Sequence, residues 1–178
     1  MSIGMKRGTV YLEPHQTEWE RAAEETIRTL KNILGNSAAD IQHIGSTSIR
    51  TISAKPIIDI AVAVNDYELI LSKRDVLENA DIIFRFDERP EQLLFVMGDF
   101  EKDTRSHHIH VVIYGSDEWN NYINFRDYLN THIAAAKEYE AVKLRLAEQY
   151  PDDRIAYTDG KQEDIDRLLA EVRVWKSK

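Results

Sequence analysis

Cysteine is absent from the 178-residue sequence. This absence excludes a disulfide framework, a zinc site built on thiolates and a cysteine nucleophile. Long apolar runs are missing too, since no uncharged stretch approaches the roughly 18 residues of a membrane span. The N-terminal segment MSIGMKRGTV also lacks the apolar core of a signal peptide. We therefore expect a cytoplasmic protein that does not associate with a membrane.

Basic residues are in the minority, with 23 Lys and Arg against 31 Asp and Glu and a net charge of −8. The acids are spread through the chain, and a diffuse negative field repels a phosphate backbone, so we expect no binding of bulk nucleic acid. A local basic cleft for a small phosphorylated molecule is compatible with this charge. The length and the ordinary globular composition predict a single domain over residues 1–178.

Hydrophobic periodicity divides the chain into a mixed part and a helical part. Apolar residues at helical spacing predict a first helix over 19–34, with Thr17 and Glu20 as a capping box and Gly35-Asn36 as its end. Asp66 is expected to cap a second helix, which extends to Leu77. Strands are expected at 41–44, 56–64, 82–86, 93–97 and 108–114.

From Ser116 onward the pattern is helical throughout. Apolar positions mark three helices, and Pro151 to Asp153 separates the last two. This order predicts an α/β (α+β) fold, with a small mixed sheet flanked by helices and a helical C-terminal part. The α/β core is expected over about residues 1–115 and the C-terminal helices over about 116–178.

The most informative segment for chemistry is the turn after the first strand and the acid that follows it. Gly45-Ser46-Thr47 predicts a tight turn whose backbone N–H groups and hydroxyls can approach a phosphate. Asp59 lies in an otherwise apolar strand, where a carboxylate must be stabilised by a metal, a cation or hydrogen bonds. The plain structural alternatives are an ordinary turn and a buried Asp held by backbone donors.

Together these features resemble the signature of the nucleotidyltransferase fold, in which a Gly-Ser turn precedes a strand with two acids one residue apart. In that fold the acids share divalent metals, which orient the triphosphate and activate the attacking group. Acids at i and i+2 of a strand face the same way, but here the partner of Asp59 is Ala61. One carboxylate cannot build the usual two-metal site, so the acidic site is expected to be degenerate.

Two histidines at the start of a later strand, His108 and His110, also share a face. The nucleotidyltransferase fold takes a third acid from a later strand, and one of these histidines can stand in its place. We predict a divalent metal site (Mg²⁺, Mn²⁺ or Zn²⁺) formed by Asp59, His108 and His110, with Asp59 and His110 as the catalytic pair. Mixed Asp and His ligands suit a transition metal better than Mg²⁺.

The same histidines motivate two other enzyme classes. Histidine-triad nucleotide hydrolases use three alternating histidines, but Val112 stands where the third would be. In the phosphoesterases built on His-x-Thr or His-x-Ser motifs, a hydroxyl is required at the position after the spacer, and Val112 replaces it as well. Both classes fit the sequence less well than the nucleotidyltransferase fold.

Longer stretches carry a closer resemblance. Residues 42–49 (QHIGSTSI) and 54–60 (AKPIIDI) resemble the central motif of the GrpB family, whose members usually read Glu-His-Ile-Gly-Ser-Thr-Ser-Val-Pro-Gly before Ala-Lys-Pro. Further family-like pieces follow in order: Trp19, Thr104 to Val112, Phe125 to Leu129, Tyr139 to Ala147 and Ala156 to Lys161. The resemblance spans about residues 10–169.

The resemblance to the GrpB family implies a nucleotidyltransferase-like fold, a domain sometimes fused to dephospho-coenzyme A kinase, and no assigned reaction. Family members commonly have an apolar residue at the position of Ala61, so the missing second acid is a family trait. Two positions depart from the family pattern. Gln42 replaces the usual Glu, and Arg50-Thr51 replaces Pro-Gly, which adds a cation near the expected phosphate site.

The cations in the matching motifs are Lys55, Arg126, Lys143 and Lys161. If they converge on one cleft they indicate an anionic ligand, although each alone is compatible with a solvated surface. The leading hypothesis is metal-dependent transfer or hydrolysis at a nucleotide phosphate, with Gly45, Ser46, Thr47 and Lys55 holding phosphate. The alternative is a non-catalytic module that binds a nucleotide or another phosphorylated metabolite. No exposed apolar stripe supports a scaffold role.

Overall fold

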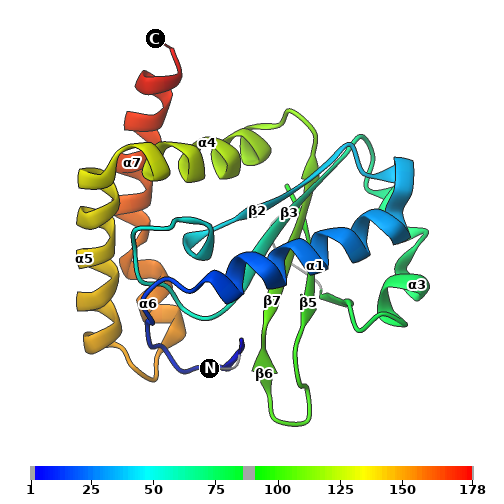
Figure 1. Ribbon diagram of the computed structural model, residues 1–178, viewed down its shortest axis with the longest axis horizontal. Coiled ribbons are helices and arrows are strands. Elements are labelled where there is room, and N and C mark those ends of the chain that lie inside the picture. Colours follow the sequence, from blue (N-terminus) through cyan, green and yellow to red (C-terminus); the bar gives the residue numbers. More distant parts are fainter. Residues whose placement is uncertain (1–2, 86–90, 178) are drawn as a thin grey trace.

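A five-stranded mixed sheet forms the centre of the computed structural model, which describes residues 3–85 and 91–177 (Figure 1). The strands, in spatial order, are β2 (Asp40–Ile44), β3 (Ile58–Val64), β7 (His107–Ile113), β5 (Leu93–Met97) and β4 (Ile83–Arg85). The central pair β3 and β7 is parallel, and the other neighbours are antiparallel. The predicted small mixed sheet is confirmed.

The expected strands match with small shifts. The strand expected at 56–64 starts at Ile58, and the one expected at 108–114 runs from His107 to Ile113. The strand expected at 82–86 is β4, and residue 86 together with residues 87–90 of the turn expected at 87–92 lies outside the described residues. One strand pair was not expected: β1 (Met5–Lys6) pairs with β6 (Thr104–Arg105) in a separate two-stranded sheet.

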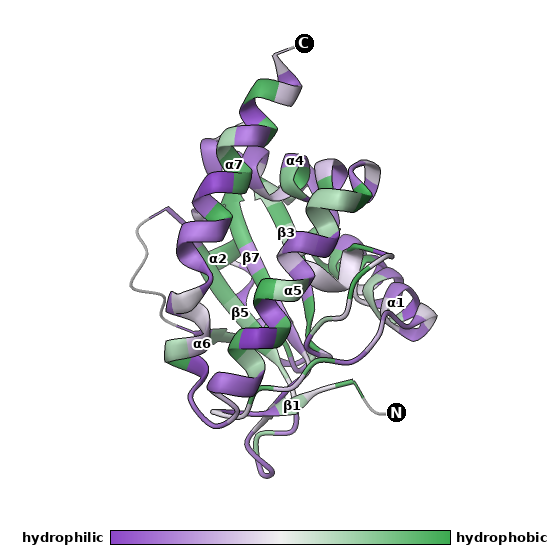
Figure 2. Cartoon of the chain, turned by 90° about the vertical axis from the view of Figure 1, so that its left-hand side faces the viewer, coloured by the Kyte–Doolittle hydropathy of each residue, from purple (hydrophilic) through white to green (hydrophobic). Residues whose placement is uncertain are grey.

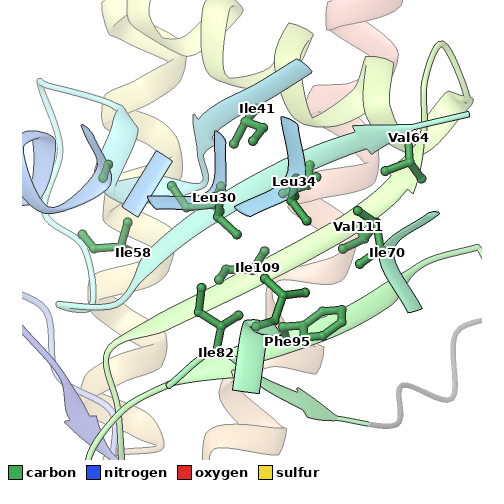
Figure 3. Close-up of a cluster of buried hydrophobic side chains, with 14 of the residues drawn as sticks. Leu30, Leu34, Ile41, Ile58, Val64, Ile70, Ile82, Phe95, Ile109 and Val111 are labelled. Carbon is green, nitrogen blue, oxygen red and sulfur yellow. The ribbon is translucent and has the colours of Figure 1, made fainter. Parts of the chain in front are cut away.

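One face of the sheet is closed by helix α1 (Thr17–Leu34). Its apolar residues recur at helical spacing, so they form a stripe that faces the strands. Figure 3 shows Leu30 and Leu34 of this stripe beside Ile109 and Val111 of β7. These side chains are at most 2% exposed, so this face is an aliphatic core.

The ends of α1 were predicted with mixed success. The capping box is wrong, because Gln16 is the N-cap and the Thr17 hydroxyl contacts the neighbouring Glu18 carboxylate instead. The end at Gly35 is confirmed: this residue has φ 53°, and its N–H donates to the carbonyl of Lys31. A short 3₁₀ helix, η1 (Gly35–Ser37), follows.

The predicted second helix is two short helices, α2 (Glu68–Leu71) and α3 (Arg74–Glu78). The N-cap of α2 is Tyr67 and not Asp66, but the Asp66 carboxylate, one residue earlier, accepts a hydrogen bond from the Glu68 N–H at 2.9 Å. Ile70 and Leu77 are buried against the aliphatic face, so both pieces contribute to the same core.

The opposite face of the sheet carries the C-terminal helices, which lie in front of the apolar strands in Figure 2. They are α4 (Asp117–Thr131), α5 (Ile133–Gln149), α6 (Arg154–Gly160) and α7 (Gln162–Lys176). Trp119 of α4 packs on Ala61, Ala63 and Val112. Helix α6 was not expected, and its N-terminus is capped by the Asp153 carboxylate. None of the helices in residues 3–85 and 91–177 combines the length and apolar character that a membrane crossing requires.

Candidate functional site

Asp59, His108 and His110 come together on the face of the sheet opposite α1. In the parallel register of β3 and β7, Asp59 lies beside His108 and Ala61 lies beside His110. The Asp59 Oδ1 is 3.3 Å from His108 Nδ1 and 3.4 Å from His110 Nε2. One candidate ligand atom from each residue lies within 4.8 Å of the others, so the three can hold one metal ion.

Asp59 and His108 have the protonation tendencies of metal ligands. Burial favours the neutral form of Asp59, but hydrogen bonds with His108 and His110 outweigh this and hold the pKa of its carboxyl well below the usual range. Burial lowers the pKa of His108, against the opposing attraction of Asp59. The Asp59 side chain is 28% exposed, so its ionised carboxylate is accessible from the cavity.

The other ring nitrogen of each histidine also has a polar neighbour. His108 Nε2 lies 3.5 Å from Nη2 of Arg154 on α6. His110 Nδ1 lies 3.5 Å from the hydroxyl of Tyr122 on α4, which donates to Gln92 at 2.9 Å. The Tyr122 hydroxyl can accept the ring N–H of a His110 that ligates through Nε2, and a partner of this kind orients the imidazole. Arg154 can only donate, so it pairs with the tautomer of His108 in which Nδ1–H faces Asp59.

The Gly-Ser turn is pressed against Asp59. Gly45 has φ 69°, and a Cβ at this position would lie 2.5 Å from Asp59 Oδ2, so a glycine is required for both reasons. A 3₁₀ turn, η2 (Ser46–Ser48), follows, and the Ser48 hydroxyl donates to the carbonyl of Gly45 at 2.6 Å. The buried Thr47 hydroxyl lies 2.9 Å from His43 Nε2. The turn is therefore held in place from two sides.

A cavity of about 310 Å³ opens beside this turn and is lined by residues from both parts of the chain. Among its described lining residues, the charged groups other than Asp59 and the histidines are four cations: Lys55, Lys143, Lys161 and Arg154. In an acidic chain this is a local reversal of charge, and it favours an anionic ligand.

Burial weakens the charge of these lysines when no anion is present. Burial, with a smaller contribution from neighbouring cations, lowers the pKa of Lys55 and Lys143 to about 7 each. Burial likewise lowers the pKa of Lys161 to about 8, against the attraction of Asp59. The ammonium groups of Lys55 and Lys161 lie 5.1 and 4.6 Å from the ring centre of Tyr157. Lys143 donates to the Ser53 carbonyl at 2.6 Å, so part of its hydrogen-bonding capacity is used within the fold.

The structure separates Arg126 from the other predicted cations. Its guanidinium donates to Gln42 Oε1 at 2.9 Å and to the His43 carbonyl at 3.0 Å. It lines a different depression, together with Arg50, which pairs with Glu20 at 2.8 Å. The predicted convergence therefore holds for Lys55, Lys143 and Lys161 but not for Arg126. Gly45, Ser46 and Thr47 also line the cavity, as expected of the turn.

Several lining residues were missed from the sequence, above all those on the unexpected helix α6. Arg154, Tyr157 and Thr158 line the cavity from this helix. Tyr139 lines it from α5, where burial raises the pKa of its phenol to about 12 and a hydrogen bond with the Ser46 side chain opposes this shift. The family-like motif over residues 156–161 was the available signal for α6, but a motif does not place a side chain in space.

Comparison with known proteins agrees with this architecture. The sequence matches the family described as GrpB protein over residues 9–171. The Glutamate-rich protein GrpB of Alkalihalophilus pseudofirmus is 38% identical over 173 residues, which cover 96% of this chain and 99% of the relative. The UPF0157 protein YqkA of Bacillus subtilis is 34% identical over 91% of this chain, which spans 47% of that longer protein.

Solved structures agree as well. The crystal structure of the conserved protein GrpB from Enterococcus faecalis superposes with a TM-score of 0.87 at 27% identity, over 94% of this chain and 100% of that one. The Cid1 poly(U) polymerase, in a structure bound to MgATP, superposes with a TM-score of 0.53 at 16% identity, over 77% of this chain and 44% of that one. The second likeness concerns the fold alone, which is nucleotidyltransferase-like. Because the family match and the relatives extend over nearly its whole length, the chain belongs to the GrpB family.

Proposed function

We propose that the cavity binds a nucleotide or a related phosphorylated molecule together with one divalent transition-metal ion, and supports transfer or hydrolysis at the phosphate. One observation carries the proposal. Three candidate ligand atoms, from Asp59, His108 and His110, lie within 4.8 Å of one another in the wall of a cavity whose other charged lining groups are cations. This pairing of a metal-binding set with an anion-binding set is what phosphate chemistry requires.

The donor set determines which metal fits. Two imidazoles and one carboxylate suit a single transition-metal ion such as Mn²⁺ or Zn²⁺, with coordination positions left open. They do not suit a pair of Mg²⁺ ions, which prefer oxygen ligands. Ala61, where a second acid would stand, is fully buried against Trp119 of α4. When bound, such an ion supplies Lewis-acid polarisation of a phosphoryl oxygen.

The chain's own residues account for the rest of the proposed chemistry. Lys55, Lys161 and Arg154 would neutralise the phosphate oxygens from the α6 side of the cavity. The turn at Gly45 and Ser46, which also lines the cavity, would contribute backbone N–H groups and a hydroxyl. A bound anion would restore the charge that burial takes from the lysines, so binding and lysine protonation are coupled.

The second candidate is a binding module without metal chemistry. It is favoured by the contacts of Asp59, whose carboxylate already has both histidines as partners and lies among cations. Such an acid is stabilised within the fold without any metal. In this case the cations and the turn would hold the phosphorylated ligand, and Asp59 would serve as an internal counter-ion.

A thermal-shift screen of nucleotides and phosphorylated metabolites separates the two candidates, with Mg²⁺, Mn²⁺ and Zn²⁺ each present and absent. A ligand that binds only the folded state raises the midpoint with its occupancy. The proposal predicts a hit that needs Mn²⁺ or Zn²⁺ in the wild type and is lost in Asp59→Asn. Asp75→Asn, an exposed site on α3, is the matched control. A hit of equal size without any metal would favour the binding module, and no hit at all would contradict both.

A further inference from the structure

A second group of cations lies beside the cavity. A groove of about 350 Å³ is lined by Arg7, Arg85, Arg105, Arg154, Leu94, Val96 and His108. The four arginines come from distant parts of the sequence, and the pairing of β1 with β6 brings the first and third of them together. No sequence motif contains these arginines together, so the groove that they line, called the arginine groove below, is apparent only from the fold.

The arginine groove adjoins the cavity. His108 and Arg154 line both spaces. In the β5–β7 register, Val96 lies beside His108 and Leu94 lies beside His110, so the groove follows the same face of the sheet. A ligand that fills the cavity can therefore extend past these two shared residues into the groove.

Two guanidinium groups of the groove lie over one aromatic ring. The Arg85 guanidinium lies 5.2 Å and the Arg105 guanidinium 4.6 Å from the centre of the Phe100 ring. Because a guanidinium that is stacked on a ring keeps its edge N–H donors free, it can still bind an anion. Arg105 also donates to the Thr104 carbonyl at 2.8 Å, so its remaining N–H groups are the ones that can bind a ligand.

Among the described residues, one carboxylate pairs with the arginines of the groove. Within residues 3–85 and 91–177, the acid at ion-pair distance from these arginines is Asp103, 3.8 Å from Arg7 and 3.7 Å from Arg105. Burial lowers the pKa of Arg105, Arg7 lowers it further, and Asp103 opposes both. The side chain of Arg105 is only 9% exposed, and a buried cation in such surroundings is stabilised by an added anion.

We propose that the arginine groove is a second phosphate-binding subsite, which holds a further phosphate group of the ligand whose first phosphate group lies in the cavity. The inference rests on the proposed function of the cavity. Arginine recognises phosphate through paired N–H donors, and the shared Arg154 lies between the two anionic groups. The substrate class is accordingly a molecule with two or more phosphate groups, whose connecting part passes Val96.

Titration calorimetry with two inorganic probes, orthophosphate and tripolyphosphate, tests this subsite on the full chain. Arg85 lines the groove and not the cavity, and it is exposed, so Arg85→Gln should fold normally. We expect Arg85→Gln to weaken tripolyphosphate binding about tenfold, the size of one charge-assisted hydrogen bond. Its affinity for orthophosphate should be unchanged. Arg28→Gln, an exposed site on α1, removes the same charge and should change neither affinity.

Tripolyphosphate binding that is equal in Arg85→Gln and Arg28→Gln would overturn the second subsite. Lys161→Gln separates this failure from a failure of the proposed function, because Lys161 lines the cavity and not the groove. If Lys161→Gln weakens both probes while Arg85→Gln weakens neither, the cavity binds phosphate and the subsite is wrong. If Arg85→Gln weakens tripolyphosphate while Lys161→Gln weakens neither probe, the cavity does not hold the first phosphate, which overturns the proposed function and the shared ligand together.

Discussion

The two faces of the central strands differ in chemistry, although consecutive residues of the same strands supply both faces. On the α1 face, β3 presents Ile58, Ile60 and Val62, which join the aliphatic core. On the other face the same strand presents Asp59 and then Ala61, small enough for α4 to pack over it. One strand thus supplies both the core and the candidate site, and the period of two keeps them apart.

On strand β7 the two faces of the sheet differ in the same way, and here the residues that differ are histidines. His107 points to the α1 side, where its Nε2 lies 3.2 Å from the Thr26 hydroxyl and burial lowers its pKa to about 4. It is a neutral core histidine, whereas His108 and His110 on the other face contact Asp59. The role of each histidine therefore depends on the face of the sheet on which it lies, and not on its neighbours in the sequence.

The largest effect that tests this comparison is on stability, at the aliphatic face. Ile60→Ala removes a fully buried side chain and leaves a cavity, so we expect a loss of about 2–5 kcal/mol in the free energy of unfolding. Urea denaturation followed by circular dichroism measures it. Val76→Ala, at a site with 55% exposure, is the control and should change stability little. Equal effects at the two sites would show that the α1 face is not the core.

Gly45→Ala addresses the candidate site, with an expected loss of about 1–3 kcal/mol from backbone strain and from the collision with Asp59. Gly115→Ala is the matched control, because Gly115 has a similar φ of 76° but no atom within 4 Å of the added Cβ. The difference between the two variants in thermal unfolding isolates the collision with Asp59. If the two variants lose the same stability, the close approach of the turn to Asp59 is contradicted.

The lysines of the cavity predict opposite pH trends for stability and for anion binding. The pKa of Lys143 falls from 10.5 to about 7 on folding, so between these values the unfolded chain binds protons that the folded protein has lost. Stability without ligand should therefore rise from pH 7 towards pH 10. Sulfate, whose charge is constant over this range, should bind more weakly as the lysines lose their protons. Melting curves with and without sulfate measure both trends.

Lys143→Met, which keeps the aliphatic stem, should flatten the stability trend, because it removes one of the groups that titrate. Arg145→Met on the same helix removes an exposed charge and should leave the trend as in the wild type. A stability that stays constant or falls between pH 7 and pH 10 would show that the lysines are not buried as described.

The smallest expected effect concerns His107. Thr26→Val removes the hydroxyl that faces the ring at 3.2 Å and keeps the shape of the side chain, so we expect a loss of about 1 kcal/mol. Metal binding, measured by calorimetry with Mn²⁺, should be unchanged because His107 lies on the other face. A loss of metal binding in this variant would contradict the separation of the two faces.

The sequence predicted those parts of the site that depend on local patterns. The period of two placed Asp59, His108 and His110 on buried strands with shared faces, and the turn at Gly45 followed from residue type alone. It did not predict α6, because seven residues from Arg154 to Gly160 are too few for a helical period to stand out.

Long-range convergence was the other limit. Lys55 and Lys161 meet at one cavity while Arg126 turns to Gln42, and this outcome depends on how α4 to α7 pack on the sheet. The two-residue strands β1 and β6 are likewise too short for alternation, so the positions of Arg7 and Arg105 could not be predicted.

Zinc titration calorimetry on tag-free protein tests the account most directly, with His107→Ala and His110→Ala as a matched pair. The two histidines lie three residues apart on one strand but on opposite faces. We expect the wild type and His107→Ala to bind one Zn²⁺ per chain, and His110→Ala to bind it at least about 100-fold more weakly. Equal affinity in His110→Ala and the wild type, or no zinc binding by the wild type, would contradict the proposed metal site.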